Sequence, residues 1–376
     1  FHCSVFRTGL LISLNDVVLR YAPPKLRLAV RWCAMTQINV LSIDGGGIRG
    51  IIPATILAAI EKCLAKQLYE VFDLIAGTST GGIIALGIGT TANNDKPYRP
   101  ADLVGLYVEN GPKIFRKDLL TPFKSLFGPK YAPDALDDVL HTFFGETELD
   151  SALTPLLISS YDLQSQLPFF FKSHRIAGDP TYNWKAREAA RATSAAPTFF
   201  PPFHLQGHGQ DYALVDGGIF VNNPGVAAYA EARRVYPDAD KFVVVSVGTG
   251  DREDKIVYEQ AKGWGLLGWA KQIVPVMMDS VSEAVDYELE SVFGTAAARC
   301  HFRLQPSLTI AANQMDDTTP ENLQNLKLQA DDYLRENAKT IQTICETLRP
   351  GRGSNLPGIG LSTTSRASAQ TAPQPR

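Results

Sequence analysis

A serine flanked by glycines is the first residue of this sequence that could act as a nucleophile. It lies in the run Gly77-Thr78-Ser79-Thr80-Gly81, which follows an apolar stretch typical of a buried strand and precedes small residues typical of a packed helix. The backbone at such a strand-to-helix turn is strained, and the flanking glycines remove side chains that would block an acyl substrate. Free N–H groups at the start of the helix would stabilise negative charge on the substrate. We therefore predict that Ser79 is a catalytic nucleophile, the alternative being a turn that merely connects two elements.

Three consecutive glycines follow the first apolar strand, in the run 44–50 with the sequence DGGGIRG. The backbone N–H groups of Gly45, Gly46 and Gly47 are unobstructed and suit an oxyanion hole for a tetrahedral acyl intermediate. The run also matches the dinucleotide pattern G-x-G-x-x-G, but such a site should have an acidic residue at the end of the next strand, where this chain has its serine turn. The oxyanion hole is the favoured interpretation. Arg49 is expected near a phosphate head group or, more commonly, in a carboxylate pair that stabilises the loop.

A serine hydroxyl needs a base within hydrogen-bond reach, and two kinds of residue near a third glycine motif qualify. Asp216 ends a predicted strand and precedes Gly217 and Gly218. His204 and His208 precede it in a polar stretch and are the histidines best placed to join a triad. A carboxylate replaces imidazole when it is close to the hydroxyl and partly desolvated, because both conditions raise its basicity. The residues alone leave a Ser-Asp dyad and a Ser-His-Asp triad open.

Apolar strands alternate with helix-like segments along the chain, which is the pattern of a layered α/β fold. Strands are expected at 38–43, 72–76, 156–161, 169–173, 213–215 and 242–247. Helices are expected at 53–68, 82–89, 185–193, 226–236 and 322–347. Each of the three glycine motifs directly follows one of these strands.

The chain has 376 residues, enough for one large domain with a sizeable core. Its hydrophobic fraction of 45%, charged fraction of 20% and net charge of −3 are ordinary for a folded protein and give no attraction to nucleic acid. The five cysteines lie far apart without a C-x-x-C pair, which argues against a disulfide framework or a zinc site and favours a reducing, cytoplasmic setting. No apolar run is long enough to span a membrane.

The folded domain is expected to cover residues 35–349. Residues 1–34 read as an N-terminal extension, because they lack the pattern of a signal peptide and precede Met35, which opens a clean strand. Residues 350–376 are rich in Gly, Ser, Thr, Pro and Gln, and we expect a disordered tail there.

The motifs together resemble those of the patatin-like phospholipases, in the bacterial type, over about Ile38 to Pro306. The elements of the resemblance occur in the family's order, and they are DGGGIRG at 44–50, GTSTG at 77–81, the block ATSAAPTFFP at 192–201 and DGG at 216–218. The resemblance implies a three-layer α/β/α fold with a central, mostly parallel sheet, related to the catalytic domain of the cytosolic phospholipases.

The same resemblance assigns the chemistry to a dyad, with Ser79 as nucleophile and Asp216 as the only base. It makes His204 and His208 loop residues without a catalytic role. No cofactor and no metal are expected. Residues expected in or beside the oxyanion hole are Gly45, Gly46, Gly47, Arg49 and Thr80, with Gly77, Gly81, Gly217 and Gly218 supporting the motifs.

The expected function is that of a serine esterase that cleaves phospholipids or lysophospholipids through an acyl-enzyme, with transient contact to a membrane surface. One alternative is a cyclic-nucleotide-activated phospholipase effector of antiphage defence, for which the sequence shows no recognisable nucleotide pocket. Another is a non-catalytic binding module, against which the intact Ser79 and Asp216 argue. A homo-oligomer is compatible with the sequence. The apolar stretch 263–278 is expected to be either a lipid-facing lip or a helix that packs on the core or a dimer contact.

Overall fold

The computed structural model describes residues 36–93, 95–116, 128–252, 256–296 and 300–348. The predictions of an extension at 1–34 and of a disordered tail at 350–376 therefore lie outside the described residues. Among the residues that the structure does describe, no helix combines the length and apolarity needed to cross a membrane, and no three His, Cys, Asp or Glu side chains gather so that they could hold a metal ion.

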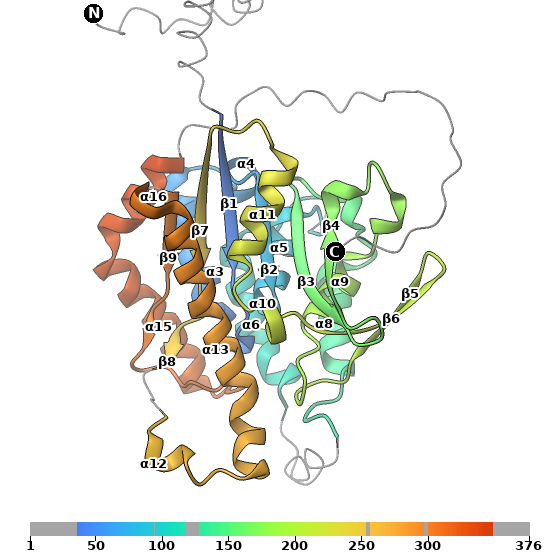
Figure 1. Ribbon diagram of the computed structural model, residues 1–376, viewed down its shortest axis with the longest axis vertical. Helices are drawn as coiled ribbons and strands as arrows, with labels where there is room; N and C mark the ends of the chain where they lie inside the picture. Colours follow the sequence, from blue (N-terminus) through green and yellow to red (C-terminus); the bar gives the residue numbers. More distant parts are fainter. Residues whose placement is uncertain (1–35, 94, 117–127, 253–255, 297–299, 349–376) are drawn as a thin grey trace, which may run out of the picture.

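An eight-stranded sheet in the order β5-β6-β3-β2-β1-β7-β9, with β4 attached to β3, forms the centre of the molecule (Figure 1). Neighbouring strands from β3 to β9 are parallel, while β4, β5 and β6 add antiparallel pairs at one side. The strands of this sheet are β1 (Gln37–Ile43), β2 (Leu74–Thr78), β3 (Leu156–Asp162), β4 (Leu167–Lys172), β5 (Phe203–Gly207), β6 (Gln210–Asp216), β7 (Lys241–Val247) and β9 (His301–Leu304). A separate two-stranded sheet pairs β8 (Asp251–Arg252) with β10 (Ser307–Leu308).

Helices cover both faces of the sheet, and Figure 1 shows α10, α11 and α13 in front of it. The α-helices are α3 (Ile51–Leu64), α4 (Leu68–Val71), α5 (Thr80–Gly89), α6 (Pro100–Ile114), α8 (Asp134–Phe144), α9 (Ala186–Thr193), α10 (Gly218–Val221), α11 (Gly225–Val235), α12 (Tyr258–Ala261), α13 (Leu266–Phe293), α15 (Pro320–Glu336) and α16 (Ala338–Leu348). The short 3-10 helices are η1 (Gly47–Gly50), η2 (Leu149–Ser151), η3 (Ser173–Arg175), η4 (Pro180–Tyr182) and η5 (Gly294–Ala296).

The two faces of the sheet carry separate hydrophobic cores, because successive side chains of a strand point to opposite faces. In β1, Leu41 and Ile43 pack into the larger core with α3, α5, α6 and α8, whereas Ile38 and Val40 pack into the smaller core with α11 and α13. This is the predicted three-layer α/β/α fold with a mostly parallel central sheet, and it is confirmed.

β2 and β6 both pair with the same edge of β3, and the end of one strand faces the end of the other. β2 runs parallel to β3 and pairs Thr78 with Ser159, whereas β6 runs antiparallel and pairs Asp216 with Ser160. The opposite edge of β3 is taken by β4. Because Ser159 and Ser160 are neighbours, the carboxyl ends of β2 and β6 meet head to head, and the residues that end them are brought together although they are far apart in the chain.

The expected strands and most expected helices are present, with ends shifted by a few residues. The helix predicted at 322–347 is wrong as a single element, since it is broken at Asn337 into α15 and α16. The polar stretch with His204 and His208 is also not a loop, because it forms the hairpin of β5 and β6. Its two turn residues, His208 and Gly209, have φ of 53° and 74°, which is typical of the tight turns that join antiparallel strands.

The cysteine spacing argues against a disulfide framework and gives no sign of the disulfide that the structure contains. Cys63, in the last turn of α3, is bonded to Cys345 of α16, at a sequence separation of 282 residues. Cysteine spacing along the chain could not reveal this pair, because only the packing of α16 against α3 brings the two residues together. Cys300 is buried and free.

Candidate active site

Ser79 occupies the sharp turn between β2 and α5, with φ of 55° and ψ of −124°. Such a positive φ is costly for a residue with a side chain and is typical of a nucleophile elbow. The Ser79 N–H donates to Thr193 Oγ1 at 2.8 Å, which fixes the turn from α9. Gly81 is required here because a Cβ atom on it would collide with the Ile43 carbonyl of the neighbouring strand.

Asp216 ends β6 and is only 2% exposed. Its backbone N–H donates to the Ala195 carbonyl at 3.0 Å, and its Oδ1 accepts from the Gly218 N–H at 2.8 Å. Asp216 Oδ2 is buried, and no described residue offers it a hydrogen bond of normal geometry. Oδ1 is therefore held in place by the Gly218 N–H, and Oδ2 is left available to accept a proton.

The segment from Thr193 to Ala195 contacts both Ser79 and Asp216. The Thr193 hydroxyl accepts from the Ser79 N–H, and the Ala195 carbonyl accepts from the Asp216 N–H. Between them, the Ser194 hydroxyl is buried and has no hydrogen-bond partner among the described residues, and Ser194 lines the same pocket as the dyad. The sequence block 192–201 was recognised only by its resemblance, and nothing in its residue types indicated this bridging role.

Burial raises the pKa of Asp216 to about 7, although the nearby Ser79 hydroxyl and the Gly218 N–H both lower it. The hydroxyl thus interacts with the carboxyl group without meeting the geometry of a regular hydrogen bond to Oδ2. A catalytic base is often loosely placed in the absence of substrate, and its most effective pKa lies near the working pH. The arrangement can take a proton from Ser79 at neutral pH.

The glycine loop is held at its first residue and open at the next two. The Gly45 N–H donates to the Asn222 carbonyl at 3.1 Å, so it is already used. The N–H groups of Gly46 and Gly47 donate to no group in the described part of the chain, and Gly47 begins η1 with φ of 60°. Thr80 is the first residue of α5, so its N–H is also free of intrahelical bonding.

The remaining predicted residues have structural positions. Arg49 is buried and donates to the carbonyls of Gly46 and Gly250, at 3.5 and 3.4 Å. No described carboxylate lies within ion-pair distance of it, so the loop is braced through backbone carbonyls instead. Gly217 packs against Ser159, where a Cβ atom would collide with the serine hydroxyl.

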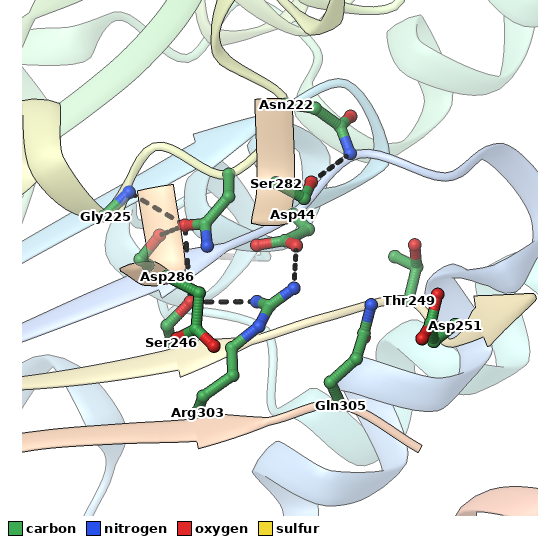
Figure 2. Close-up of polar contacts among 12 residues, drawn as sticks. Asp44, Asn222, Gly225, Ser246, Thr249, Asp251, Ser282, Asp286, Arg303 and Gln305 are labelled. Carbon is green, nitrogen blue, oxygen red and sulfur yellow. Dashed lines mark hydrogen bonds and ion pairs between the residues drawn. The ribbon is translucent and has the colours of Figure 1, made fainter. Parts of the chain in front are cut away.

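An ion pair behind the glycine loop was missed by the sequence reasoning (Figure 2). Arg303 of β9 donates to Asp44 Oδ2 at 2.7 Å and to Ser246 Oγ at 2.9 Å. Asp44 is the residue directly before the three glycines, and the Thr249 hydroxyl donates to the Gly45 carbonyl at 2.7 Å. Burial raises the pKa of Asp44 in spite of the opposing Arg303, whose own pKa is raised by the surrounding carboxylates.

The dyad opens into an apolar pocket with an empty volume of about 770 Å³, part of it open to solvent. The wall comes mainly from α6, α8, the segment 194–200 and α13, and it includes Leu106, Ile114, Phe115, Leu136, Val139, Leu140, Phe199, Phe200, Val274 and Met278. Such a lining suits a hydrocarbon chain attached to the carbonyl that Ser79 would attack.

The two candidate histidines lie away from this pocket. His204 is exposed in β5 and its Nε2 pairs with Asp211 at 2.5 Å, while His208 Nε2 contacts the Asn183 carbonyl at 3.1 Å. Neither lines the pocket that contains the dyad. Among the described residues that line this pocket with Ser79, Asp216 is the carboxylic acid, and the other titratable group is Tyr107, whose pKa is raised further by burial.

The apolar stretch 263–278 belongs largely to α13, which has some side chains in the pocket wall and others exposed to solvent. Val274 and Met278 line the pocket, so this part of the helix packs on the site. Trp269, Ile273 and Met277 are instead exposed to solvent.

Comparisons with known proteins show which proteins this chain is similar to. A family model described as patatin-like phospholipase matches residues 41–229. Patatin-like protein 2 of Arabidopsis thaliana is 34% identical over 339 residues, covering 80% of this chain and 83% of that protein. Patatin-T5 of Solanum tuberosum is 33% identical over 331 residues, covering 80% of this chain and 84% of that protein. Both relatives are plant proteins. The solved structure of VipD from Legionella pneumophila covers 81% of this chain and 67% of its own, with a TM-score of 0.33 and 13% identity.

Proposed function

This chain belongs to the patatin-like phospholipase family, a family of lipid acyl hydrolases, and we propose that it cleaves lipid esters of the phospholipase A or lysophospholipase type through a Ser79–Asp216 dyad. The observation that carries the proposal is the free, buried Oδ2 of Asp216 next to the elbow of Ser79. The Gly218 N–H occupies Oδ1 only, so Oδ2 has no regular hydrogen-bond partner among the described residues, and the raised pKa of the carboxyl group is the one a base needs near neutral pH.

In the proposed reaction, Asp216 accepts the Ser79 proton while Ser79 Oγ attacks the ester carbonyl. The N–H groups of Gly46, Gly47 and Thr80 face the oxyanion, because they are the ones left without a partner. Collapse of the tetrahedral intermediate expels the alcohol, which takes the proton from Asp216, and leaves an acyl-enzyme. Water, deprotonated by Asp216, then attacks the acyl carbonyl. The second tetrahedral intermediate collapses to the fatty acid, and the departing Ser79 Oγ takes the proton back from Asp216.

The pocket supports an acyl chain as the main recognised group. Most of its wall is hydrocarbon, and the polar side chains that line it are those of Ser79, Asp216, Ser194, Thr80 and Tyr107. An alcohol leaves more readily than an amine, so esters are better substrates than peptides for a base that is also the only proton donor. We also propose transient contact with a lipid surface; assembly into a homo-oligomer stays a prediction.

The inference of a cytoplasmic location from cysteine spacing no longer holds. The Cys63–Cys345 disulfide is of a kind that persists mainly in oxidising compartments. Mass spectrometry after alkylation of thiols in freshly lysed cells tests the location, since a cytoplasmic enzyme should carry alkyl groups on both cysteines.

Labelling with a fluorophosphonate probe tests the proposed function. Wild type should be labelled at Ser79 and hydrolyse short-chain esters, Ser79→Ala should take no label, and Asp216→Asn should retain the fold but lose hydrolysis. A folded wild type that takes no label and cleaves no ester would favour a binding module with this fold. Substantial turnover by Asp216→Asn would show that another group is the base.

A further inference from the structure

We propose that an exposed apolar surface on α12 and the first half of α13 inserts into an electrically neutral lipid surface and places the pocket mouth against it. This surface, which we call the lip, consists of the exposed residues Ile256, Val257 and Tyr258 leading into α12 and Trp269, Ile273 and Met277 on α13, with the partly buried Trp264 between the two helices. The inference rests on the proposed function, since it names the physical form in which the lipid substrate is met.

Large apolar side chains are exposed on the lip to an unusual extent. Of the twelve exposed large hydrophobic residues in the described part of the chain, six lie between positions 256 and 277. Val257 is 51% exposed, Trp269 43%, Ile273 40% and Met277 39%. Large exposed apolar side chains that gather in one part of a protein mark sites that bind another protein, a ligand or a membrane.

The lip continues directly into the acyl pocket. Trp269, Ile273 and Met277 follow each other at intervals of four residues and therefore form one stripe along α13. Val274 and Met278, one position further on, lie about 100° around the helix and line the pocket. Neighbouring apolar side chains of one helix therefore lie partly in the pocket wall and partly on the outer surface. Such an arrangement provides an apolar path for an acyl chain.

Charge and aromatic content favour a neutral lipid interface over an anionic one. Between 256 and 277 the sequence has one acidic residue, Glu259, and two basic ones, Lys262 and Lys271. Glu259 is paired with Lys262. A basic cluster that would bind anionic head groups is therefore missing from this stretch. The rings of Trp264 and Trp269 pack edge to face, with their centroids 5.3 Å apart. Tryptophan is enriched at the interface between the hydrocarbon of a membrane and water.

The position of the lip in the molecule fits this occupant. Figure 1 shows α12 and the first turns of α13 at the lower end of the view, beyond the ends of the sheet strands. A lipid surface could meet this end of the molecule without displacing either of the two helical layers. Residues that extend from the body in this way reach an interface before the polar surface around them does.

Vesicle binding tests the lip separately from catalysis. The full chain with Ser79→Ala is mixed with vesicles of phosphatidylcholine alone and sedimented. Adding Ile273→Glu should weaken partitioning at least about tenfold, because an inserted aliphatic side chain is replaced by a charge. Leu328→Glu on α15 is the matched control, since Leu328 is exposed to 43% and lies outside the lip, and it should bind as the parent does. Trp269→Phe should remove most of the fluorescence blue shift on binding.

Activity provides the second readout. Against a water-soluble, monomeric short-chain ester, wild type, Ile273→Glu and Leu328→Glu should be equal, because Ile273 does not line the pocket. Against phosphatidylcholine vesicles, only Ile273→Glu should lose at least about tenfold of the rate.

Several results would overturn the lip. The first is equal vesicle binding by Ile273→Glu and the control. The second is binding that requires phosphatidylglycerol and disappears in high salt. The third is a wild-type dimer in solution that Ile273→Glu dissociates without changing vesicle binding. A wild type that hydrolyses no ester contradicts the proposed function instead, while vesicle binding by the Ser79→Ala chain still decides the lip.

Discussion

At the scale of single residues, the site depends on a carboxyl group placed where a charge is unfavourable. Asp216 is 2% exposed and keeps one oxygen without a regular partner, and burial raises its pKa to about 7. The folded protein therefore holds a proton on Asp216 at pH values where the unfolded chain has lost it. Function and stability are in conflict at this residue, because the basicity that serves the reaction comes from unfavourable burial of the ionised form.

Asp216→Asn should abolish ester hydrolysis and at the same time stabilise the fold at alkaline pH. The folded pKa is above the unfolded value, so wild type loses stability as pH rises from about 4 to about 7, by up to about 4 kcal/mol. Asparagine has no charge to bury, and its carbonyl can still accept from the Gly218 N–H. Urea unfolding of both proteins at pH 4.5 and at pH 8, chosen as about the ends of this window, measures the difference. A mutant advantage that is equal at both pH values would contradict the raised pKa.

The double variant His204→Ala/His208→Ala should leave ester hydrolysis largely unchanged. The rate of wild type should rise as pH passes through about 7, because Asp216 must be ionised to accept the Ser79 proton. This rise alone does not identify the base, since ordinary histidines titrate near the same pH. It should persist in the double variant. Its disappearance, together with a large loss of labelling at Ser79, would replace the dyad by a triad.

At the scale of elements, three segments from distant parts of the sequence determine the geometry of the site. β2 and β6 end head to head on β3, and the segment after α9 ties the two ends together through Thr193 and Ala195. The glycine loop is held from the other side by β9, through Arg303 and Asp44. The oxyanion loop therefore depends on a residue that follows it by most of the length of the domain.

Arg303→Met should destabilise the protein by about 3–5 kcal/mol, because it leaves Asp44 buried without its counter-charge. Asp44→Asn added to Arg303→Met should recover part of this loss, and Arg303→Lys should lose less than Arg303→Met. Urea unfolding of wild type, Arg303→Met, Asp44→Asn and the double variant gives the coupling energy of the pair. Arg335→Met is the control, since Arg335 is exposed on α15 and should change stability by less than about 1 kcal/mol. Additive losses in the double variant would mean that the pair does not act as a unit.

The sequence was sufficient to predict the fold and the short-range parts of the site. Ser79 and the glycine loop follow strands directly and Asp216 ends one, so continuous apolar runs and turn glycines locate them. The Arg303–Asp44 pair, the Cys63–Cys345 disulfide and the Thr193 contact could not be predicted, because each depends on the packing of elements remote in sequence. The β5–β6 hairpin was missed for a local reason: its turn is His208-Gly209, and its polar residues do not show the apolar alternation of a strand.

At the scale of the whole molecule, one covalent bond fastens the end of the described chain to its beginning. Cys63 lies on α3 and Cys345 on α16, and both are on the side of the sheet with the larger core. α16 is the last described helix, and its contacts with the rest of the molecule are few compared with those of the central strands. The disulfide should therefore matter most for the attachment of this terminal layer.

Reduction of the disulfide should lower the free energy of unfolding by about 2–4 kcal/mol, with about 5 kcal/mol as the limit for so long a closed segment. Wild type should unfold at a lower urea concentration in the presence of dithiothreitol. The variant Cys63→Ser/Cys345→Ser should have this lower stability with or without the reductant, and Cys300→Ser should still respond to it. An identical midpoint for wild type in both conditions would contradict a stabilising bond.

The bond between α3 and α16 also makes a covalent ring of the chain from Cys63 to Cys345, and both Ser79 and Asp216 lie within that ring. A protease that cuts the ring once therefore does not produce two separate fragments. The nicked protein keeps its nucleophile and its base in one molecule. It runs as a single band on a denaturing gel without reductant and as two bands when the reductant is added. Loss of backbone continuity and loss of the enzyme thus become separate events, and the second requires either another cut or a reducing environment.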